Sequence, residues 1–193
     1  MVFNLAEVAG QLAGRVPEQL ADESHTPAAV ALLLRSGGAG LEVLFIERAP
    51  HGGDPWSGDL GFPGGKVEAG DGDPRRAAER ETWEELGIEL ERARYLGHLA
   101  DIAGAHLPIR VSCFVYGLET AARFILSEEI RDVFWVPLAA LADPQRQVTA
   151  TVYFQGEPLE RPAILLPTPG KPVLWGITYR LVRQFLELLP DGA

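Results

Sequence analysis

Residues 64–88, GGKVEAGDGDPRRAAERETWEELGI, carry the strongest local structural signals in the chain. A glycine-rich turn comes first. Asp73 is then a suitable N-cap, and Pro74 suits the first position of a helix. The residues that follow are mostly good helix formers, and Gly87 is a natural terminator. The stretch therefore predicts a loop followed by a helix over residues 74–86.

Three glutamates of this predicted helix lie close together on its surface. At about 100° per residue, Glu84 and Glu85 fall about 60° and 40° to either side of Glu81. Carboxylates this close repel one another, and a hard divalent cation with oxygen ligands removes the repulsion. The residues alone leave a second interpretation open, in which the face is simply solvated. Trp83 and Leu86 point away from the glutamates and are expected to pack.

The stretch resembles the Nudix box, Gly-x5-Glu-x7-Arg-Glu-U-x-Glu-Glu-x-Gly-U, where U is a bulky aliphatic residue. Counting from Gly65, Asp71 stands where the family has Glu, and eight residues instead of seven lead to Arg80. Residues 80–88 then fit, except that Thr82 stands at an aliphatic position. We place the extra residue in the loop before the helix. The resemblance implies the Nudix α/β/α sandwich, with a mixed β-sheet between helices and the box at residues 65–88.

The resemblance also implies a metal site and its catalytic groups. The implied cofactor is Mg²⁺ or Mn²⁺, and the implied ligands are Glu81, Glu85, Glu84 and the carbonyl of Gly64. The i, i+4 spacing of Glu81 and Glu85 suits two ligands of one ion. Arg80 is expected to pair with a glutamate and hold it in place. Either a carboxylate such as Glu84 or the later Glu129 takes the proton from water, and the sequence leaves this choice open.

A second resemblance lies just upstream, in the Gly- and Pro-rich stretch at residues 47–65, which is expected to lack regular structure. Nudix enzymes that cleave coenzyme A carry an added motif here, which Arg48, Gly58 and Phe62-Pro63-Gly64-Gly65 match. The spacing from Arg48 to Gly58 is one residue longer than in that motif. Its second arginine is absent, with Gly53 or Asp54 at that place. The implied substrate contacts are Arg48, Gly58, Phe62 and Lys66.

A third match comes late in the chain. Trp175-Gly176-Ile177-Thr178 resembles the Trp-Gly-x-Thr that opens the last helix of the same coenzyme A-cleaving enzymes. The implied reaction is metal-dependent hydrolysis of the diphosphate bond of coenzyme A or its thioesters. Because one arginine is missing, another nucleoside diphosphate derivative such as ADP-ribose stays an alternative substrate. A non-catalytic nucleotide-binding module is the alternative from a different class.

Composition limits the partners of the protein. The 193 residues suit one domain, and the formal net charge of −10 argues against binding of nucleic acid or an anionic membrane. The single cysteine, Cys113, lies in an apolar run, which indicates a buried thiol and no intrachain disulfide. With no signal-peptide pattern at the N-terminus, we expect a cytoplasmic protein. Its expected partner is a small diphosphate substrate, and the sequence leaves monomer and homodimer open.

Hydrophobic periodicity predicts the remaining elements. An N-terminal helical extension of about residues 1–26 is expected to contain helices near 3–14 and 17–22. Strands are expected at 28–34, 41–47, 95–103, 109–118 and 133–137, with a short helix at 138–141 and a hairpin of strands 147–154 and 159–166. An amphipathic helix that buries Leu181, Val182, Phe185, Leu188 and Leu189 is expected to follow Trp175.

Overall fold

The computed structural model describes residues 4–20, 24–50, 57–105, 107–119 and 123–189. The helices of this part are α1 (Leu5–Leu12), α2 (Pro74–Leu86), α3 (Leu138–Ala142) and α4 (Gly176–Glu187), with 3-10 turns at Leu90–Arg92 and Pro144–Arg146. The strands are β1 (Thr26–Gly37), β2 (Gly40–Arg48), β3 (Leu60–Gly61), β4 (Gly64–Lys66), β5 (Arg94–His98), β6 (Ile102–Ala103), β7 (Ile109–Leu118), β8 (Ile130–Pro137), β9 (Gln147–Phe154) and β10 (Glu157–Ile164).

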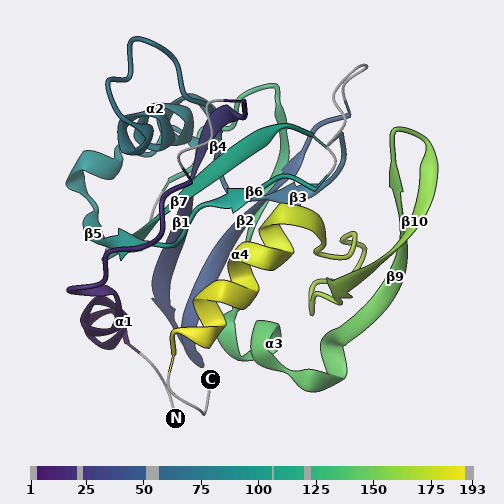
Figure 1. Ribbon diagram of the computed structural model, residues 1–193. Helices are drawn as coiled ribbons and strands as arrows, with labels where there is room; N and C mark the ends of the chain where they lie inside the picture. Colours follow the sequence, from purple (N-terminus) through teal and green to yellow (C-terminus); the bar gives the residue numbers. More distant parts are fainter. Residues whose placement is uncertain (1–3, 21–23, 51–56, 106, 120–122, 190–193) are drawn as a thin grey trace.

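Eight of these strands form one mixed sheet (Figure 1). Its central order is β3-β2-β1-β7-β5, with β4 paired to β1, β6 to β7 and β8 to β2. The long β1–β7 pair is parallel, while β1 and β2 form an antiparallel hairpin. Beyond this hairpin, β1 pairs with β4 and β2 pairs with β3. The sheet therefore opens between β1 and β2, next to Gly64, where the glycine-rich turn and helix of residues 64–88 begin.

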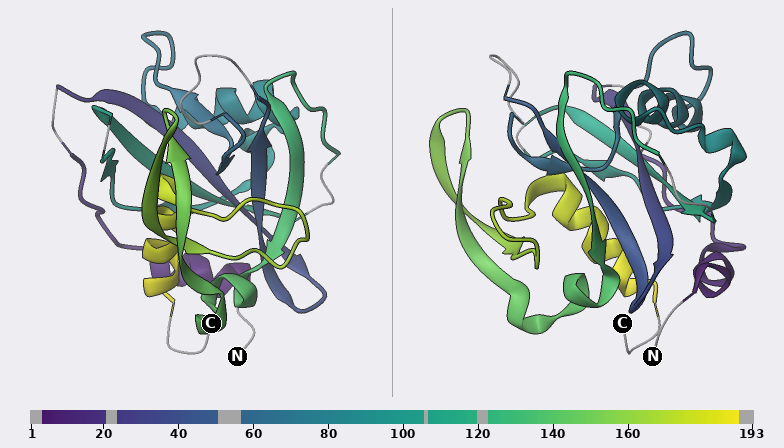
Figure 2. Two further views of the ribbon diagram at one scale, coloured as in Figure 1. Left: turned by 90° about the vertical axis from the view of Figure 1, so that its right-hand side faces the viewer. Right: turned by 180° about the vertical axis from the view of Figure 1, so that it is seen from behind.

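Alternation along β1 divides the core between the two faces of the sheet. Leu32 and Leu34 face one cluster, together with apolar residues of α1, α3 and α4. Ala31 and Leu33 face the other cluster, together with apolar residues of α2. Figures 1 and 2 show α2 on one side of the sheet and α4 on the other. The predicted α/β/α sandwich is confirmed.

The β9–β10 hairpin forms a separate two-stranded sheet beside this sandwich (Figure 2). Its register pairs Phe154 with Glu157 and Gln147 with Ile164, so Gln155 and Gly156 form the turn. The hairpin was predicted, but its second strand begins and ends two residues earlier than expected. Leu165 already leaves the strand, and its backbone N–H donates to the carbonyl of Arg146.

Several element predictions are confirmed, and others are corrected. The helix at 74–86 and the strand at 109–118 have the predicted bounds. The expected strand 95–103 is two strands, β5 and β6, which both pair with β7. The loop at 47–65 contains two short strands, β3 and β4, although residues 51–56 lie outside the described part.

The prediction of a second N-terminal helix is wrong over its described residues, 17–20, which form neither helix nor strand. Tertiary hydrogen bonds take the backbone groups that a helix would have used. The N–H of Leu20 donates to Asp101 Oδ2 at 3.1 Å, and the carbonyl of Glu18 accepts from the N–H of Asp101 at 3.0 Å. Arg110 also donates to the Leu20 carbonyl. The first predicted helix is present as α1, where Asn4 and Glu7 form a capping box.

Across the described ranges, every helix is too short or too polar to span a membrane. The predicted burial of Cys113 is confirmed, since its thiol is fully enclosed within β7.

Candidate active site

Two glutamates of α2 lie against the glycine pair at the start of β4. The backbone N–H of Gly64 donates to Glu85 Oε2 at 2.9 Å. A Cβ on Gly65 would overlap the carboxylate of Glu81. Gly64 has a φ of +150°, and a Cβ there would overlap the backbone of β1 at Ala29 and Val30. Glycine at 65 therefore lets the carboxylate of Glu81 approach the backbone, and glycine at 64 lets β4 pack closely against β1.

The local sequence explains why α2 places these side chains where it does. Asp73 caps the helix by accepting from the N–H of Arg76 at 3.1 Å, and Pro74 occupies the first turn. Gly87 ends the helix with its N–H bonded to the carbonyl of Trp83. Buried Glu79 accepts from the hydroxyl of Tyr116 on β7 at 2.8 Å, which fixes the rotation of α2 on the sheet.

Arg80 joins three carboxylates in front of the glycine pair. Its Nε and Nη2 donate to the two oxygens of Asp71, at 2.8 and 3.1 Å. Its Nη1 donates to Glu81 Oε1 and Glu84 Oε2, both at 3.0 Å. Nη2 also reaches the carbonyl of Lys66 at 3.2 Å. The predicted pairing of Arg80 with a glutamate is present, and Asp71, whose role the sequence left unassigned, holds the other side of the guanidinium.

The three glutamates differ in burial more than the helical wheel suggests. The side chain of Glu85 is 5% exposed and that of Glu84 is 53% exposed, with Glu81 between them. Leu86 is buried as expected, but Trp83 is 52% exposed, so its predicted packing is wrong. Of the three carboxylates, that of Glu85 therefore lies against the sheet and that of Glu84 faces solvent. Trp83 lies next to Glu84 on the exposed side of α2.

Arg48, at the end of β2, approaches the same carboxylates from another part of the sheet. Its Nη1 lies 3.8 Å from Glu85 Oε1. The next residue, Ala49, donates its N–H to the carbonyl of Glu129 at 2.7 Å. The charge of Glu129 also acts on both Glu81 and Glu85. The structure thus brings Arg48 and Glu129, which are distant in sequence, to the Nudix-box glutamates.

The electrostatics of this cluster favour an added positive charge. The pKa of Glu85 is raised to about 8, chiefly by burial and also by the charges of Glu81 and Glu129, against the opposing effects of Gly64 and Arg48. Burial likewise raises the pKa of Glu81, although the hydrogen bond from Arg80 opposes the shift. In contrast, the hydrogen bond from Arg80 lowers the pKa of Asp71. A buried carboxylate among like charges is what a bound cation would stabilise.

These residues fit a hard divalent cation in donor type and charge. Carboxylate oxygens of Glu81 and Glu85 beside a glycine backbone are the ligands that Mg²⁺ and Mn²⁺ prefer. In the side-chain arrangement of the described residues, however, no three Asp, Glu, His or Cys side chains gather closely enough to hold a metal ion. In this arrangement Glu84 is bonded to Arg80. The ligand roles of Glu81, Glu84, Glu85 and Gly64 stay predictions.

The other three predicted substrate contacts, Phe62, Lys66 and Gly58, lie in different surroundings. Phe62 is buried and stacks on Phe45 with ring centroids 5.3 Å apart, so its observed contacts are within the core. Lys66 is exposed. Gly58 adjoins Asp59, whose carboxylate accepts a hydrogen bond from the indole of Trp175 at 2.9 Å. The second and third sequence matches therefore meet in space. Gly53 and Asp54 lie outside the described residues.

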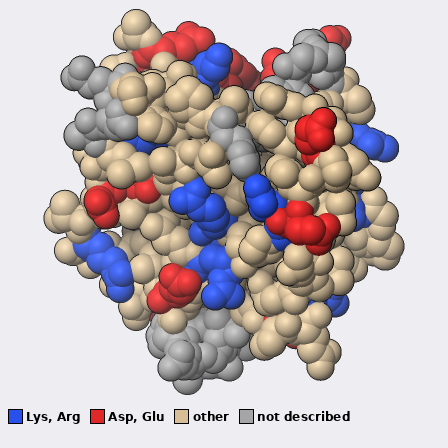
Figure 3. Space-filling view, turned by 45° about the vertical axis from the view of Figure 1, so that its right-hand side comes forward, with Lys and Arg blue, Asp and Glu red and all other residues tan. Residues whose placement is uncertain are grey.

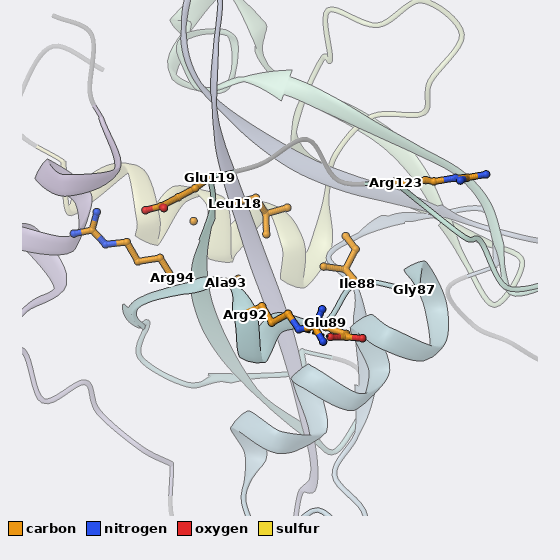
Figure 4. Close-up of a pocket in the computed structure, with 10 residues that line it drawn as sticks. Gly87, Ile88, Glu89, Arg92, Ala93, Arg94, Leu118, Glu119 and Arg123 are labelled. Atoms are coloured by element: carbon orange, nitrogen blue, oxygen red, sulfur yellow. Dashed lines mark ion pairs between the residues drawn. The ribbon is translucent and has the colours of Figure 1, made fainter.

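A cavity of about 530 Å³ lies at the carboxyl end of α2 and adjoins the Nudix box. It is lined by Gly87, Ile88, Glu89, Arg92, Ala93, Arg94, Gly117, Leu118, Glu119 and Arg123. Figure 4 shows Arg94 and Arg123 extending to opposite sides of it, while Arg92 lies beside Glu89, with which it pairs. Its charged groups do not converge, and none of the predicted catalytic glutamates lines it.

The fold, the box and the glycine-backed carboxylates together define a class of protein. Residues 24–155 match the NUDIX domain model, and the chain belongs to this family. The predicted relationship to Nudix hydrolases is confirmed.

Among individual proteins, a probable Nudix hydrolase of Schizosaccharomyces pombe is 27% identical over 167 residues, which cover 86% of this chain and 57% of that protein. The human mitochondrial coenzyme A diphosphatase NUDT8 is 31% identical over 137 residues, which cover 70% of this chain and 57% of that protein. This chain therefore spans little more than half the length of these two relatives.

Solved structures agree on the fold. The NUDIX domain of Shewanella oneidensis NrtR, solved in complex with ADP ribose, superimposes with a TM-score of 0.58 at 20% identity. The match covers 94% of this chain and 98% of that one. At this identity the likeness concerns the fold alone.

Proposed function

We propose that the protein is a metal-dependent Nudix hydrolase that cleaves the diphosphate bond of coenzyme A or its thioesters. The products are 4′-phosphopantetheine, or its acyl form, and adenosine 3′,5′-bisphosphate. The observation that carries this proposal is the 3.8 Å approach of Arg48 to Glu85. It joins the motif typical of coenzyme A-cleaving enzymes to the Nudix-box carboxylates. The similarity to coenzyme A diphosphatases supports the same substrate class.

The residues of the site have separable roles in this reaction. Glu81 and Glu85, with Glu84 and the Gly64 carbonyl, hold the cation. When bound, a divalent cation supplies positive charge beside the diphosphate and makes a water molecule a better nucleophile. Arg48 contacts a substrate phosphate with its guanidinium, whose shape and charge suit phosphate oxygens. Because Arg80 already bonds Asp71, Glu81 and Glu84, it orients carboxylates and does not reach the substrate.

The proton of the attacking water needs an acceptor. Glu129 is exposed, and its charge acts on Glu81 and Glu85, so it is the acceptor that we favour over Glu84. Glu84 already accepts a hydrogen bond from Arg80, so one of its two carboxylate oxygens is engaged.

The acidic composition does not exclude an anionic substrate. The formal net charge is −10, although Lys and Arg side chains gather near the middle of the face that carries α4 and the β9–β10 hairpin (Figure 3). At the site itself the positive charge for a diphosphate would come from Arg48 and from a bound cation.

A substrate panel tests the proposal. The purified protein is assayed with Mg²⁺ and with Mn²⁺ against coenzyme A, acetyl-coenzyme A, ADP-ribose and a dinucleotide polyphosphate, and the substrates are ranked by kcat/KM. We expect a coenzyme A compound to rank first. The substrate assignment fails if coenzyme A stays intact while ADP-ribose is hydrolysed. ADP-ribose is the second candidate because the second arginine of the upstream motif is missing.

A further inference from the structure

The segment between β10 and α4, residues 165–175, lies beyond the part of the chain that matches the family model and makes specific contacts with the site region. The left view of Figure 2 shows it reaching across to β8. Two of its side chains, Lys171 and Trp175, hold the two stretches that flank Arg48 in space.

Lys171 holds the end of β2. Its Nζ donates to Glu47 Oε2 at 2.7 Å and to the carboxylate of Asp132, and it lies 4.7 Å from the ring centroid of Phe134. The Lys171 side chain is only 13% exposed, and the Glu47 side chain is buried. Breaking an ion pair of this kind is costly because the remaining charge is buried. Glu47 keeps a second partner, Arg131, whose Nη1 lies 3.1 Å from Glu47 Oε1, so loss of Lys171 loosens Glu47 without leaving it unpaired.

Trp175 holds the other flank. Its indole Nε1 donates to Asp59 Oδ1 at 2.9 Å, and the carbonyl of Asp59 accepts from the N–H of Arg48 at 3.1 Å. Two hydrogen bonds therefore link Trp175 to Arg48 by way of Asp59.

Arg48 lies between these two attachments, at an irregular point of its strand. The register of β2 against β8 shifts between Glu47 and Arg48. A bulge of this kind turns a side chain out of the regular alternation, and here the turned side chain reaches Glu85. The direction of the Arg48 guanidinium therefore depends on how firmly Glu47 and Asp59 are held.

We propose that Lys171 and Trp175 are positioning residues that set the affinity for substrate phosphate through Arg48. This inference rests on the proposed function, in which Arg48 contacts a phosphate. Neither residue touches the substrate or the carboxylates of the site. Losing either attachment lets Arg48 sample several directions, and the entropy of reordering it then opposes substrate binding.

A double-mutant cycle tests the proposal. K171M keeps the length of the side chain and removes its charge, W175F removes only the indole N–H, and both are combined with R48M. On the diphosphate that wild type hydrolyses best, we expect K171M and W175F to raise KM by about tenfold and to change kcat by less than about threefold. In the R48M background each should change KM by less than about twofold. K171R should recover most of the affinity.

The control is R183M, which removes an exposed i, i+4 pair with Glu187 on α4. It should leave KM unchanged. Equal KM increases from K171M with and without Arg48 would overturn the proposal, as would unchanged KM accompanied only by a lower melting temperature.

Hydrogen exchange gives a readout that needs no turnover. The peptide containing Arg48 and Ala49 should exchange faster in K171M than in wild type or R183M, because the N–H of Arg48 is bonded within the held region. Unchanged exchange contradicts the positioning role. If no diphosphate is hydrolysed, the proposed function fails. In that case the role of Lys171 is decided separately, by comparing K171M with wild type in hydrogen exchange and in calorimetric binding of coenzyme A.

Discussion

The guanidinium Nη1 of Arg48, at the end of β2, lies 3.8 Å from Oε1 of Glu85, which belongs to α2. This approach brings a cation from the upstream motif to the most buried carboxylate of the Nudix box. It makes two kinds of prediction possible, one about phosphate binding at Arg48 and one about the charge state of Glu85.

The first prediction concerns Arg48. R48M should lower kcat/KM for coenzyme A by roughly 10- to 100-fold, mostly through KM, because a charge-assisted hydrogen bond contributes about 1.5–3 kcal/mol. Steady-state kinetics measure the change. R35M is the matched control, since Arg35 pairs with Glu42 and lies over Trp135, which pairs with the middle of β2. Equal losses in the two variants would mean that Arg48 acts only through stability.

The second prediction concerns Glu85 and the hydrolase assignment itself. E85Q should lower kcat by at least ~10²- to 10³-fold, since removal of even one group that stabilises developing charge costs this much. Circular dichroism should show an unchanged fold. E91Q removes an exposed partner of Arg76 on the far side of α2 and should keep full activity. Unchanged turnover in E85Q would favour a binding module without catalysis.

The third prediction uses the pKa of Glu85, which burial raises from 4.5 to about 8. Between these values the folded protein, without metal, holds a proton on Glu85 that the unfolded chain releases. The free energy of unfolding should therefore fall as pH rises from about 5 to about 8. The raised pKa of Glu81 acts in the same direction.

Urea unfolding in the presence of a chelator measures this slope. In E85Q the decline should be clearly shallower than in wild type, because Gln cannot release a proton. Parallel curves for the two proteins would show that Glu85 is not the group responsible. The pKa of Asp71 is lowered, so its contribution to the pH dependence of stability falls at more acidic pH, outside this range.

The fourth prediction concerns Asp71. D71N removes the charge that holds one side of Arg80, so the guanidinium should shift and disorder Glu81 and Glu84. We expect kcat to fall roughly tenfold with little change in KM for coenzyme A. D71E restores both the charge and the residue usual at this position of the box, and it should recover most of the activity. A D71N enzyme with wild-type kcat would remove Asp71 from the site.

The bounds of α2 could be predicted because its start and end are decided locally. Asp73, Pro74 and Gly87 fix them through caps and backbone preferences, and nothing distant competes. Residues 17–20 show the opposite case. Their pattern suits a helix, but hydrogen bonds with Asp101 and Arg110 take their backbone groups. Sequence periodicity does not contain those contacts.

The candidate site shows the same division. Motif spacing found Glu81, Glu85 and Arg48, but it could not find the link from Lys171 to Glu47, which joins residues far apart in the chain. In the sequence Asp71 is only a departure from the family pattern. Its hydrogen bonds to Arg80 join the loop before α2 to the helix, and motif spacing does not predict such a contact. Trp83 was expected to pack, yet about half of its side chain stays exposed, and the helical pattern of α2 does not show how far neighbouring elements cover it.

The most direct test of the whole account is product analysis by mass spectrometry after incubation with coenzyme A in heavy-oxygen water. With Mg²⁺ or Mn²⁺ present, the account predicts 4′-phosphopantetheine and adenosine 3′,5′-bisphosphate, with one heavy oxygen on one of the two new phosphates. With a chelator in place of the metal, neither product should form. Intact coenzyme A in the presence of metal, or release of inorganic phosphate instead of these two products, would contradict it.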